Sequence, residues 1–450
     1  MRWLAIALLV ASACGDNERP DCGDAPAMCR ASCGYGAGDR PNLTLHDYPT
    51  GSAIPIDHVV LVMQENRTFD HYFSSLSIPG QDIDVAPPGA SNPDPLNPGQ
   101  TISRFHQTQY CFDDPAENWD EVHREIDGGA LDAFTTVNAE DDPEGDPSGA
   151  RTMGYYDESD IPYYYALARN WALSDRHFSS VQANTWPNRM FYMAGTSYGV
   201  ITDDFPPNAT QIDAHGNLTP NLFTRMNDAN VSWKFYAQDL PTLAILYATL
   251  QRSSAHVAPY AQFATDAAAG TLPQVSFVEG TALDGGITAD EDPPADMQFG
   301  QQMVSQIVAA VTSSPLWPHT ALFLSYDEQG GFYDHVPPQP ACAPDDTPPA
   351  LAPGDFEAAF DETGLRVPLI VVSPYAKRGY VSHVVTDHTS ITRFVEARFG
   401  LPALTHRDAN AVPPFDMFDF GHADLSVPVM PDAVIDPVQG SACAAKFPHQ

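Results

Sequence analysis

The chain is poor in positive charge. Of its 450 residues, 21 are Lys or Arg and 58 are Asp or Glu, which gives a formal net charge of −37. Nucleic acids and anionic lipid surfaces attract basic side chains, whereas a field of this sign repels them. The composition therefore excludes a nucleic-acid binder that relies on general electrostatics. A phosphate-bearing substrate would have to be held locally, and a metal ion is the first candidate for that role.

Several sequence signals are also missing. There is no internal repeat, no P-loop and no Rossmann glycine fingerprint. Proline-rich stretches occur at 86–98, 141–147, 337–353 and 412–437, which are too spread out to mark one domain boundary. With 43% hydrophobic and 10% aromatic residues the chain can bury a core, unlike acidic disordered tails. We expect one large domain over residues 54–450.

The apolar run near the N-terminus is too short to cross a membrane. It covers residues 3–10, between Arg2 and the small residues before Cys14, whereas a transmembrane helix needs about 20 residues. This pattern predicts an export signal over residues 1–13. Residues 11–14, Ala-Ser-Ala-Cys, resemble a lipobox that would put a lipid anchor and membrane contact on Cys14, but they equally fit a plain signal-peptidase site. An outer-membrane or cell-surface lipoprotein and a periplasmic or secreted protein both stay open.

Cysteine is scarce, and its distribution suits disulfides. Without Cys14, an even number remains, which fits three disulfides in an oxidising compartment. The six are Cys22, Cys29, Cys33, Cys111, Cys342 and Cys443. A zinc site at the first three is the alternative, although it lacks a C-x-x-C pair and a nearby fourth ligand. Residues 14–53 are rich in Gly, Asp and Cys without hydrophobic periodicity, so we expect a tether stapled by disulfides.

Apolar runs that alternate with helical patterns predict an α/β fold. The predicted strands cover residues 56–63, 231–236, 274–278, 321–325 and 367–372, and the predicted helices 161–172, 297–311 and 389–399. Continuous apolar strands are typical of parallel sheets that are covered on both faces. We therefore expect a doubly wound, mostly parallel central sheet with helices on both faces.

Polar residues directly follow two of these strands. Strand 56–63 leads into Glu65 and Asn66, and strand 321–325 leads into Asp327 and Glu328. Ligands of doubly wound sheets bind beyond the carboxyl ends of the strands. Three carboxylates and one amide oxygen at such an edge would form a hard, oxygen-rich metal site. The alternative is that these acids are solvated loop residues or helix N-caps.

Two segments offer a hydroxyl nucleophile. Thr185 lies close to Asn188 and Arg189, and it could act if a metal lowered the pKa of its hydroxyl; Pro187 suggests that this segment is a turn. Residues 195–199 fit the G-x-S-x-G elbow of serine esterases after an apolar run. An elbow must lead into a helix, however, and the prolines at 206–207 prevent one from running far.

Four ordered segments resemble a known family. They are IDHVVLVMQENRTFDHYFSSL at 56–76, TWPNR at 185–189, YDEQGGFYDHV at 326–336, and GLRVPLIVVSP at 364–374 with DHTS at 387–390. Together they are similar to the bacterial phosphoesterase family of phospholipases C and acid phosphatase A type enzymes, which lies within the alkaline phosphatase superfamily. The resemblance covers about residues 54–402.

The resemblance implies a role for each matching residue. The implied metal ligands are Glu65, Asn66, Thr185, Asp327 and Glu328, and Thr185 would also take up the phosphoryl group before water hydrolyses the phosphothreonine. Asn188 and Arg189 would orient Thr185 or the phosphate, or else fix their loop. His335 and His388 would serve as acid–base groups or as partners of other site residues, or else be structural. The divalent cation could be Ca, Mg, Mn or Zn.

Two positions depart from the family pattern. Glu117 and Asp292 stand where relatives typically carry histidines that are thought to contact phosphate or protonate the leaving group. Carboxylates would repel phosphate unless they are protonated or metal-bound. They could instead recruit another cation.

A run of tyrosines invites a choline-binding aromatic box. Its members are Tyr155, Tyr156, Tyr163, Tyr164 and Tyr165. Pro162 and the apolar residues 166–168 favour instead the first turn of a packed helix.

The sequence thus predicts a metal-dependent phosphoesterase that works through a phosphothreonine. Phospholipids or phosphocholine esters are the leading substrates, as for a phospholipase C, and an acid phosphatase acting on phosphomonoesters is the second possibility. A hypothesis of another class is a catalytically weak surface protein that binds metal or ligand. The oligomeric state is left open.

Overall fold

The computed structural model describes residues 26–204, 218–239, 241–242, 246, 254–280 and 289–447. An eight-stranded sheet forms its centre. The strand order is β13 (Tyr380–Ser382), β6 (Ala172–Ser174), β12 (Leu369–Val372), β11 (Thr320–Tyr326), β1 (His58–Gln64), β10 (Val275–Glu279), β8 (Trp233–Ala237) and β9 (Val257–Pro259). Among these strands β12 alone runs antiparallel to its neighbours, β11 and β6. The predicted mostly parallel sheet is therefore confirmed.

The central strands are buried on both faces. Every residue of β11 is buried, as is every residue of β1 after His58, which explains why both read as continuous apolar runs. Five strands lie where the apolar runs predicted them. The three-residue strands β6, β9 and β13 were not predicted, because so short a run carries too little pattern. Ala172, expected at the end of a helix, instead begins β6.

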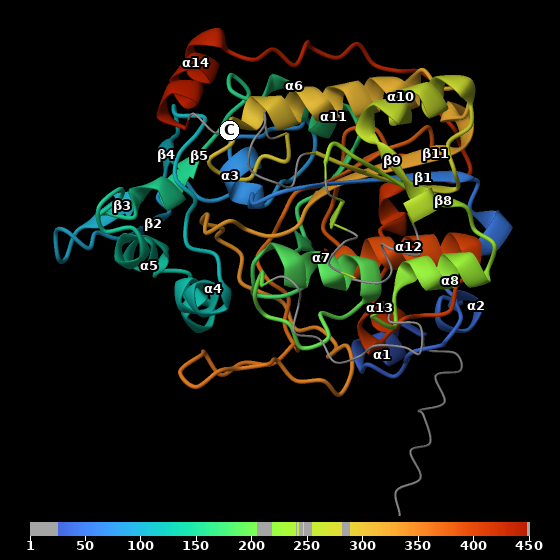
Figure 1. The fold of residues 1–450 in the computed structure, drawn as a ribbon, viewed down its shortest axis with the longest axis horizontal. Coiled ribbons are helices and arrows are strands. Elements are labelled where there is room, and N and C mark those ends of the chain that lie inside the picture. Colours follow the sequence, from blue (N-terminus) through green and yellow to red (C-terminus); the bar gives the residue numbers. More distant parts are fainter. Residues whose placement is uncertain are drawn as a thin grey trace, which may run out of the picture.

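Helices cover both faces of the sheet. Figure 1 shows α6 (Pro162–Asn170), α10 (Tyr260–Ala269) and α11 (Met297–Thr312) on one side, and α7 (Thr185–Ala194), α8 (Leu222–Asp228) and α12 (His388–Phe399) on the other. Met303, Ile307 and Val311 of α11 are buried, as their spacing predicted. The doubly wound architecture is confirmed.

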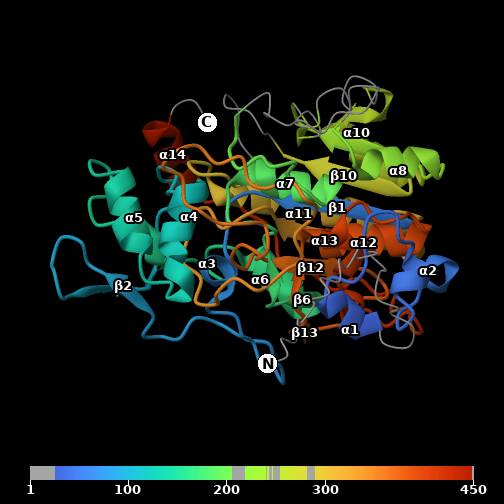
Figure 2. The same cartoon turned by 90° about the horizontal axis from the view of Figure 1, so that it is seen from below.

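Shorter elements surround this core. The helices are α1 (Pro26–Ala31), α2 (Pro41–Thr44), α3 (Phe69–Phe73), α4 (Trp119–Ile126), α5 (Phe134–Asp141), α13 (His406–Asn410) and α14 (Pro437–Lys446). The short strands are β2 (Ser91–Pro93), β3 (Thr101–Ser103), β4 (Phe105–His106), β5 (Gly154–Tyr155), β7 (His177–Phe178) and β14 (Thr386–Asp387). Both views show α4, α5 and β2 together at one end of the molecule (Figure 1 and Figure 2). None of the described helices is both long and apolar enough to span a membrane.

The segment around Pro187 is a helix, which corrects the predicted turn. Pro187 is the third residue of α7, and proline is tolerated in a first turn because the N–H groups there have no intrahelical acceptor. The apolar run that precedes Gly195 is this same helix. A serine-esterase elbow follows a strand, whereas Ser197 comes after a helix in the chain and is fully buried. The serine-esterase alternative is therefore wrong.

Disulfides connect distant parts of the chain. Cys33 pairs with Cys342 and Cys111 pairs with Cys443, and Cys29 is disulfide-bonded as well. Because disulfide sulfurs cannot bind zinc as thiolates, the zinc alternative is wrong. Cys22, Cys14 and the predicted export signal lie outside the described residues.

Candidate active site

The carboxyl ends of β1 and β11 bring four of the predicted ligands together. The two strands pair in parallel up to Gln64 opposite Tyr326, so the residues that follow are neighbours. The backbone N–H of Asn66 donates to Asp327 Oδ1 at 3.3 Å, and the N–H of Glu328 donates to the same oxygen at 2.8 Å. All of these side chains are buried. The neighbourhood that the strand ends predicted is present.

Arg189 is the cation at the centre of these acids. Its guanidinium lies 2.6 Å from Glu65 Oε1, 3.0 Å from Glu279 Oε1 and 2.9 Å from Asp327 Oδ2, and its side chain is 2% exposed. Burial opposes its charge, but the three carboxylates outweigh that effect and raise the pKa of Arg189. Glu279 was missed by the sequence analysis. It ends β10, so the rule that selected Glu65 and Asp327 could have found it.

Thr185 lies on the same side of α7 as Arg189. It is the first residue of the helix, one turn before Arg189, and residues four apart share a helix face. The exposed fraction of Thr185 is 8%, so the residue is almost fully enclosed. At the same helix end Asp203 Oδ1 accepts a hydrogen bond from the N–H of Trp186 at 2.8 Å. Burial raises the pKa of Asp203 to about 7.

Asn188 holds the chain that leads into α7. Its Oδ1 accepts the N–H of Val181 at 3.0 Å, and its Nδ2 donates to the carbonyls of Val181, Ala183 and Asn184. These contacts match the alternative in which Asn188 fixes its loop.

Glu117 and Asp292, the departures from the family pattern, both reach the site. Asn66 Nδ2 donates to Glu117 Oε2 at 2.8 Å and to Asp292 Oδ1 at 2.6 Å. Burial, followed by the nearby charges of Asp114 and Glu328, raises the pKa of Glu117 well above its usual value. Burial and Asp114 do the same to the pKa of Asp292.

Two buried oxygens of the predicted ligands lack partners. Asn66 Oδ1 and Glu328 Oε1 make no hydrogen bond with any described residue. Buried polar atoms are nearly always paired, so such oxygens indicate a site for a cation or a ligand.

His388 contacts the backbone at the end of β11. Its Nε2 lies 2.9 Å from the carbonyl oxygen of Tyr326, the residue before Asp327. Because a carbonyl only accepts, Nε2 carries the proton. Burial lowers the pKa of His388 to about 4, so the ring is neutral near neutral pH.

His335 lies in a separate ion cluster. Its Nδ1 is 2.6 Å from Asp70 Oδ2 and its Nε2 is 3.0 Å from Asp84 Oδ1, while Arg366 contacts Asp70 and Asp334. Asp70, Asp334 and His335 also form one of two described groups whose spacing could hold a metal. Arg366 already neutralises those acids. The contacts of His335 are to this cluster and not to the acids around Arg189.

We expect His335 to make stability depend on pH. Burial alone would lower the pKa of His335, but the hydrogen bond and charge of Asp70 outweigh it and raise the pKa above 6.5. The stabilisation is therefore complete below the unfolded-state pKa of about 6.5 and is lost as pH rises through the raised folded-state value. Urea unfolding of the wild type and His335→Gln between pH 6 and 9 should show a steeper loss of stability in the wild type. Parallel pH profiles would contradict this role.

Three of the tyrosines pack in the core within one helix, as the helix interpretation predicted. Tyr163, Tyr164 and Tyr165 lie in α6 and are buried. Tyr72, Tyr164 and Tyr326 donate hydrogen bonds to the buried carboxylate of Glu291. Asp290, the residue before Glu291, accepts the N–H of Glu65 at 2.7 Å through its carbonyl. The cluster thus anchors the segment that carries Asp292.

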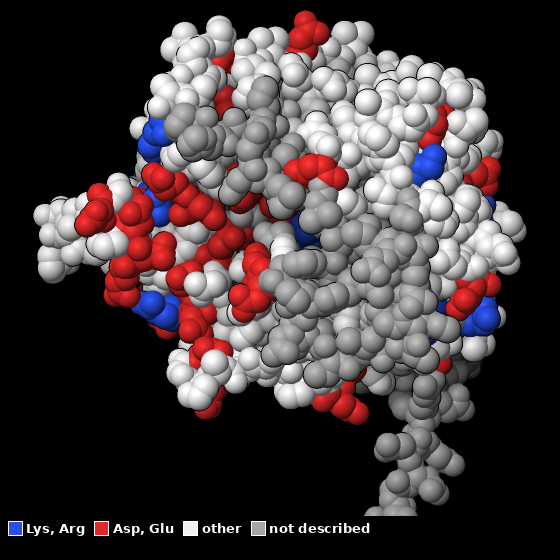
Figure 3. Space-filling view, viewed as in Figure 1, with Lys and Arg blue, Asp and Glu red and all other residues white. Residues whose placement is uncertain are grey.

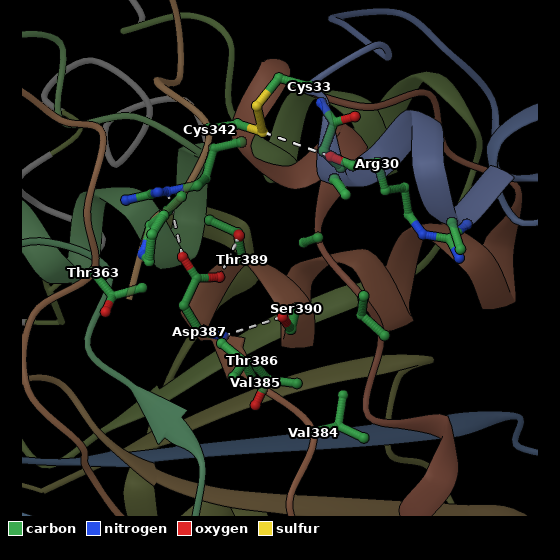
Figure 4. A pocket seen from close by; sticks show the side chains of 18 of the residues that line it. Arg30, Cys33, Cys342, Thr363, Val384, Val385, Thr386, Asp387, Thr389 and Ser390 are labelled. Atoms are coloured by element: carbon green, nitrogen blue, oxygen red, sulfur yellow. Dashed lines mark hydrogen bonds and ion pairs between the residues drawn. A yellow bond between two sulfur atoms is a disulfide. The ribbon is translucent and has the colours of Figure 1, made fainter. Parts of the chain in front are cut away.

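An acidic surface area and a cavity are two further features of the molecule. Asp and Glu side chains gather on the left half of the face in Figure 3, with few Lys and Arg among them. A cavity of about 510 Å³ lies elsewhere, between the Cys33–Cys342 disulfide and Val384 and Val385 (Figure 4). The described residues that line this cavity include none of the predicted site residues.

Strand-end acids and a hydroxyl at the start of a helix are groups that the hydrolysis of a phosphoric ester can use. The model of the Phosphoesterase family matches residues 56–402, so the chain belongs to this family. Phospholipase C B of Mycobacterium tuberculosis is 30% identical over 92% of this chain and 88% of that protein. Non-specific phospholipase C6 of Arabidopsis thaliana is 31% identical over 79% of this chain and 70% of that protein. A solved structure of an alkaline phosphatase superfamily protein from Vibrio parahaemolyticus matches at 8% identity over 80% of this chain and 78% of that one, with a TM-score of 0.35.

Proposed function

We propose that this phosphoesterase hydrolyses phospholipids or phosphocholine esters with Thr185 as its nucleophile and a divalent cation at the strand ends. The observation that carries the proposal is the position of Thr185, one helical turn before the arginine that binds Glu65 and Asp327. The relatives named phospholipase C support the substrate class.

The residues at the strand ends fit a cation. Glu65, Asn66, Asp327 and Glu328 offer only oxygen donors, and two of these oxygens are buried without a partner. An oxygen-only set suits Ca, Mg or Mn better than Zn. When bound, the cation would neutralise phosphate charge and lower the pKa of the threonine hydroxyl.

The chain's own groups would divide the work. The Thr185 oxygen loses its proton and forms a bond to phosphorus while the bond from phosphorus to the leaving oxygen breaks. The leaving oxygen takes up a proton and departs as the alcohol, and the headgroup phosphate stays on Thr185 as a phosphothreonine ester. Water then attacks that phosphorus and releases the phosphorylated headgroup and the threonine hydroxyl. The N-terminal end of α7 favours the negative charge next to Thr185. Arg189 offsets three acids that would otherwise repel the substrate.

Electrostatics favours diesters over monoesters. A phosphodiester carries one negative charge, whereas a phosphomonoester carries about 1.5 to 2 near neutral pH. In their ionised forms, Glu117 and Asp292 next to Asn66 would repel the second charge. Because burial raises the pKa of both acids, this repulsion grows as pH rises. This contrast supports a phospholipase C rather than an acid phosphatase.

Export is part of the proposal. The disulfides support folding in an oxidising compartment. A lipid anchor on Cys14 stays a prediction from the sequence.

We expect metal-dependent release of nitrophenol from nitrophenyl phosphorylcholine, at a kcat/KM at least about tenfold above that on nitrophenyl phosphate, since one additional close charge repulsion costs about 1.4 kcal/mol or more. The assay compares both esters after dialysis against EDTA and after adding back Ca²⁺, Mg²⁺ or Mn²⁺. Release from the simple ester alone would instead indicate an acid phosphatase. No release with any cation would support the binding-protein hypothesis.

A further inference from the structure

Glu117 and Asp292 converge on a single amide group. Asn66 Nδ2 lies 2.8 Å from Glu117 Oε2 and 2.6 Å from Asp292 Oδ1. An amide nitrogen has two hydrogens, and a carboxyl oxygen that carries no proton only accepts. The two contacts therefore use both hydrogens and determine which end of the amide faces the acids.

The opposite end of this amide is buried and has no partner. Asn66 is 0% exposed, and its Oδ1 makes no hydrogen bond with any described residue. The backbone below it is held as well. Its φ is +60°, its N–H donates to Asp327 Oδ1, and a Cβ on Gly330 would lie 2.7 Å from the Asn66 Cβ. The position of Oδ1 is thus set by contacts on both sides of the residue.

We propose that Glu117 and Asp292 are positioning residues that hold the Asn66 carbonyl oxygen toward the cation. The inference rests on the proposed function, because it requires a cation at the strand ends. A ligand whose other polar atoms are already hydrogen-bonded needs no reorientation when the metal binds. The two acids act through Asn66 and do not contact the cation themselves.

The contacts favour this role over a second cation site. Glu117 Oε2 and Asp292 Oδ1 face the Asn66 nitrogen, so the amide already engages one oxygen of each carboxylate.

The test is calorimetric titration of the full chain with Mn²⁺. We expect Glu117→Ala/Asp292→Ala to lower the Mn²⁺ affinity about 10- to 100-fold at unchanged stoichiometry. The matched control is Glu117→Gln/Asp292→Asn, which removes the same two charges but keeps oxygens that accept from Asn66. Its affinity should stay near that of the wild type. If the alanine pair does not fold, the two single alanine variants replace it.

A variant of Asn66 itself tests whether the two acids act through this residue. A carboxylate has two equivalent oxygens and needs no orientation, so in the Asn66→Asp background the alanine pair should change Mn²⁺ affinity little. An equal loss in both backgrounds would overturn the proposal. If the Glu117→Gln/Asp292→Asn variant binds one Mn²⁺ fewer than the wild type, the acids are direct ligands and the proposal is wrong. A wild type that binds no Mn²⁺, Mg²⁺ or Ca²⁺ would instead refute the proposed metal-dependent function.

Discussion

Thr185→Ala should lower kcat on nitrophenyl phosphorylcholine by a factor on the order of 10⁴ or more, because loss of a nucleophile leaves only positioning and charge effects. Thr185 begins α7 on the face that also carries Arg189. The measurement is steady-state hydrolysis in the presence of the activating cation.

Two controls make this result specific. Thr185→Ser keeps a hydroxyl and should retain activity far above that of Thr185→Ala. Acid quenching during turnover, followed by mass spectrometry, should find a phosphorylcholine group on residue 185 in the wild type and in the serine variant. An alanine variant with activity close to wild type would show that the nucleophile lies elsewhere.

Arg189→Met should destabilise the fold by about 3–5 kcal/mol, because removal of one partner from a buried ion network leaves uncompensated charge. The side chain is 2% exposed and binds Glu65, Glu279 and Asp327. The free energy of unfolding in urea, measured in EDTA at neutral pH, tests this value. Because the remaining acids then lack their only described counter-ion, added Mn²⁺ should restore more stability to the variant than to the wild type.

The matched control is Arg124→Met. Arg124 pairs with Glu140 at the surface, where both side chains are largely exposed, and an exposed pair contributes about 1 kcal/mol or less. Equal losses in the two variants would contradict a special role for the buried network.

Much of the core followed from local pattern. The residues of β1, β10 and β11 are apolar on both faces because the strands are covered on both sides, and such runs are recognisable without knowledge of the fold. The acids after β1 and β11 were found because parallel strands end at one edge. The antiparallel direction of β12 could not be read in this way, since an apolar strand has the same pattern in either direction.

Other parts of the site depend on contacts between distant segments. Pro187 suggested a turn because proline breaks a helix interior, but it is tolerated here because it lies in the first turn of α7. Arg189 reaches Glu65, Glu279 and Asp327, which come from three strands. His335 belongs to the same motif as Asp327 and Glu328 in the sequence, but in the structure it lies with Asp70 and Asp84.

The sequence by itself determined the α/β class, the strands that meet at the site, the acids at their ends and membership of a phosphoesterase family. These features depend on residue type, spacing and order, which are local properties. Only the tertiary structure decided that Arg189 neutralises those acids, that Asn188 fixes a loop, and that Glu117 and Asp292 bind the Asn66 amide. Each of those roles depends on which atoms lie within about 3 Å of one another, because hydrogen bonds require such distances and ion pairs weaken as the distance grows.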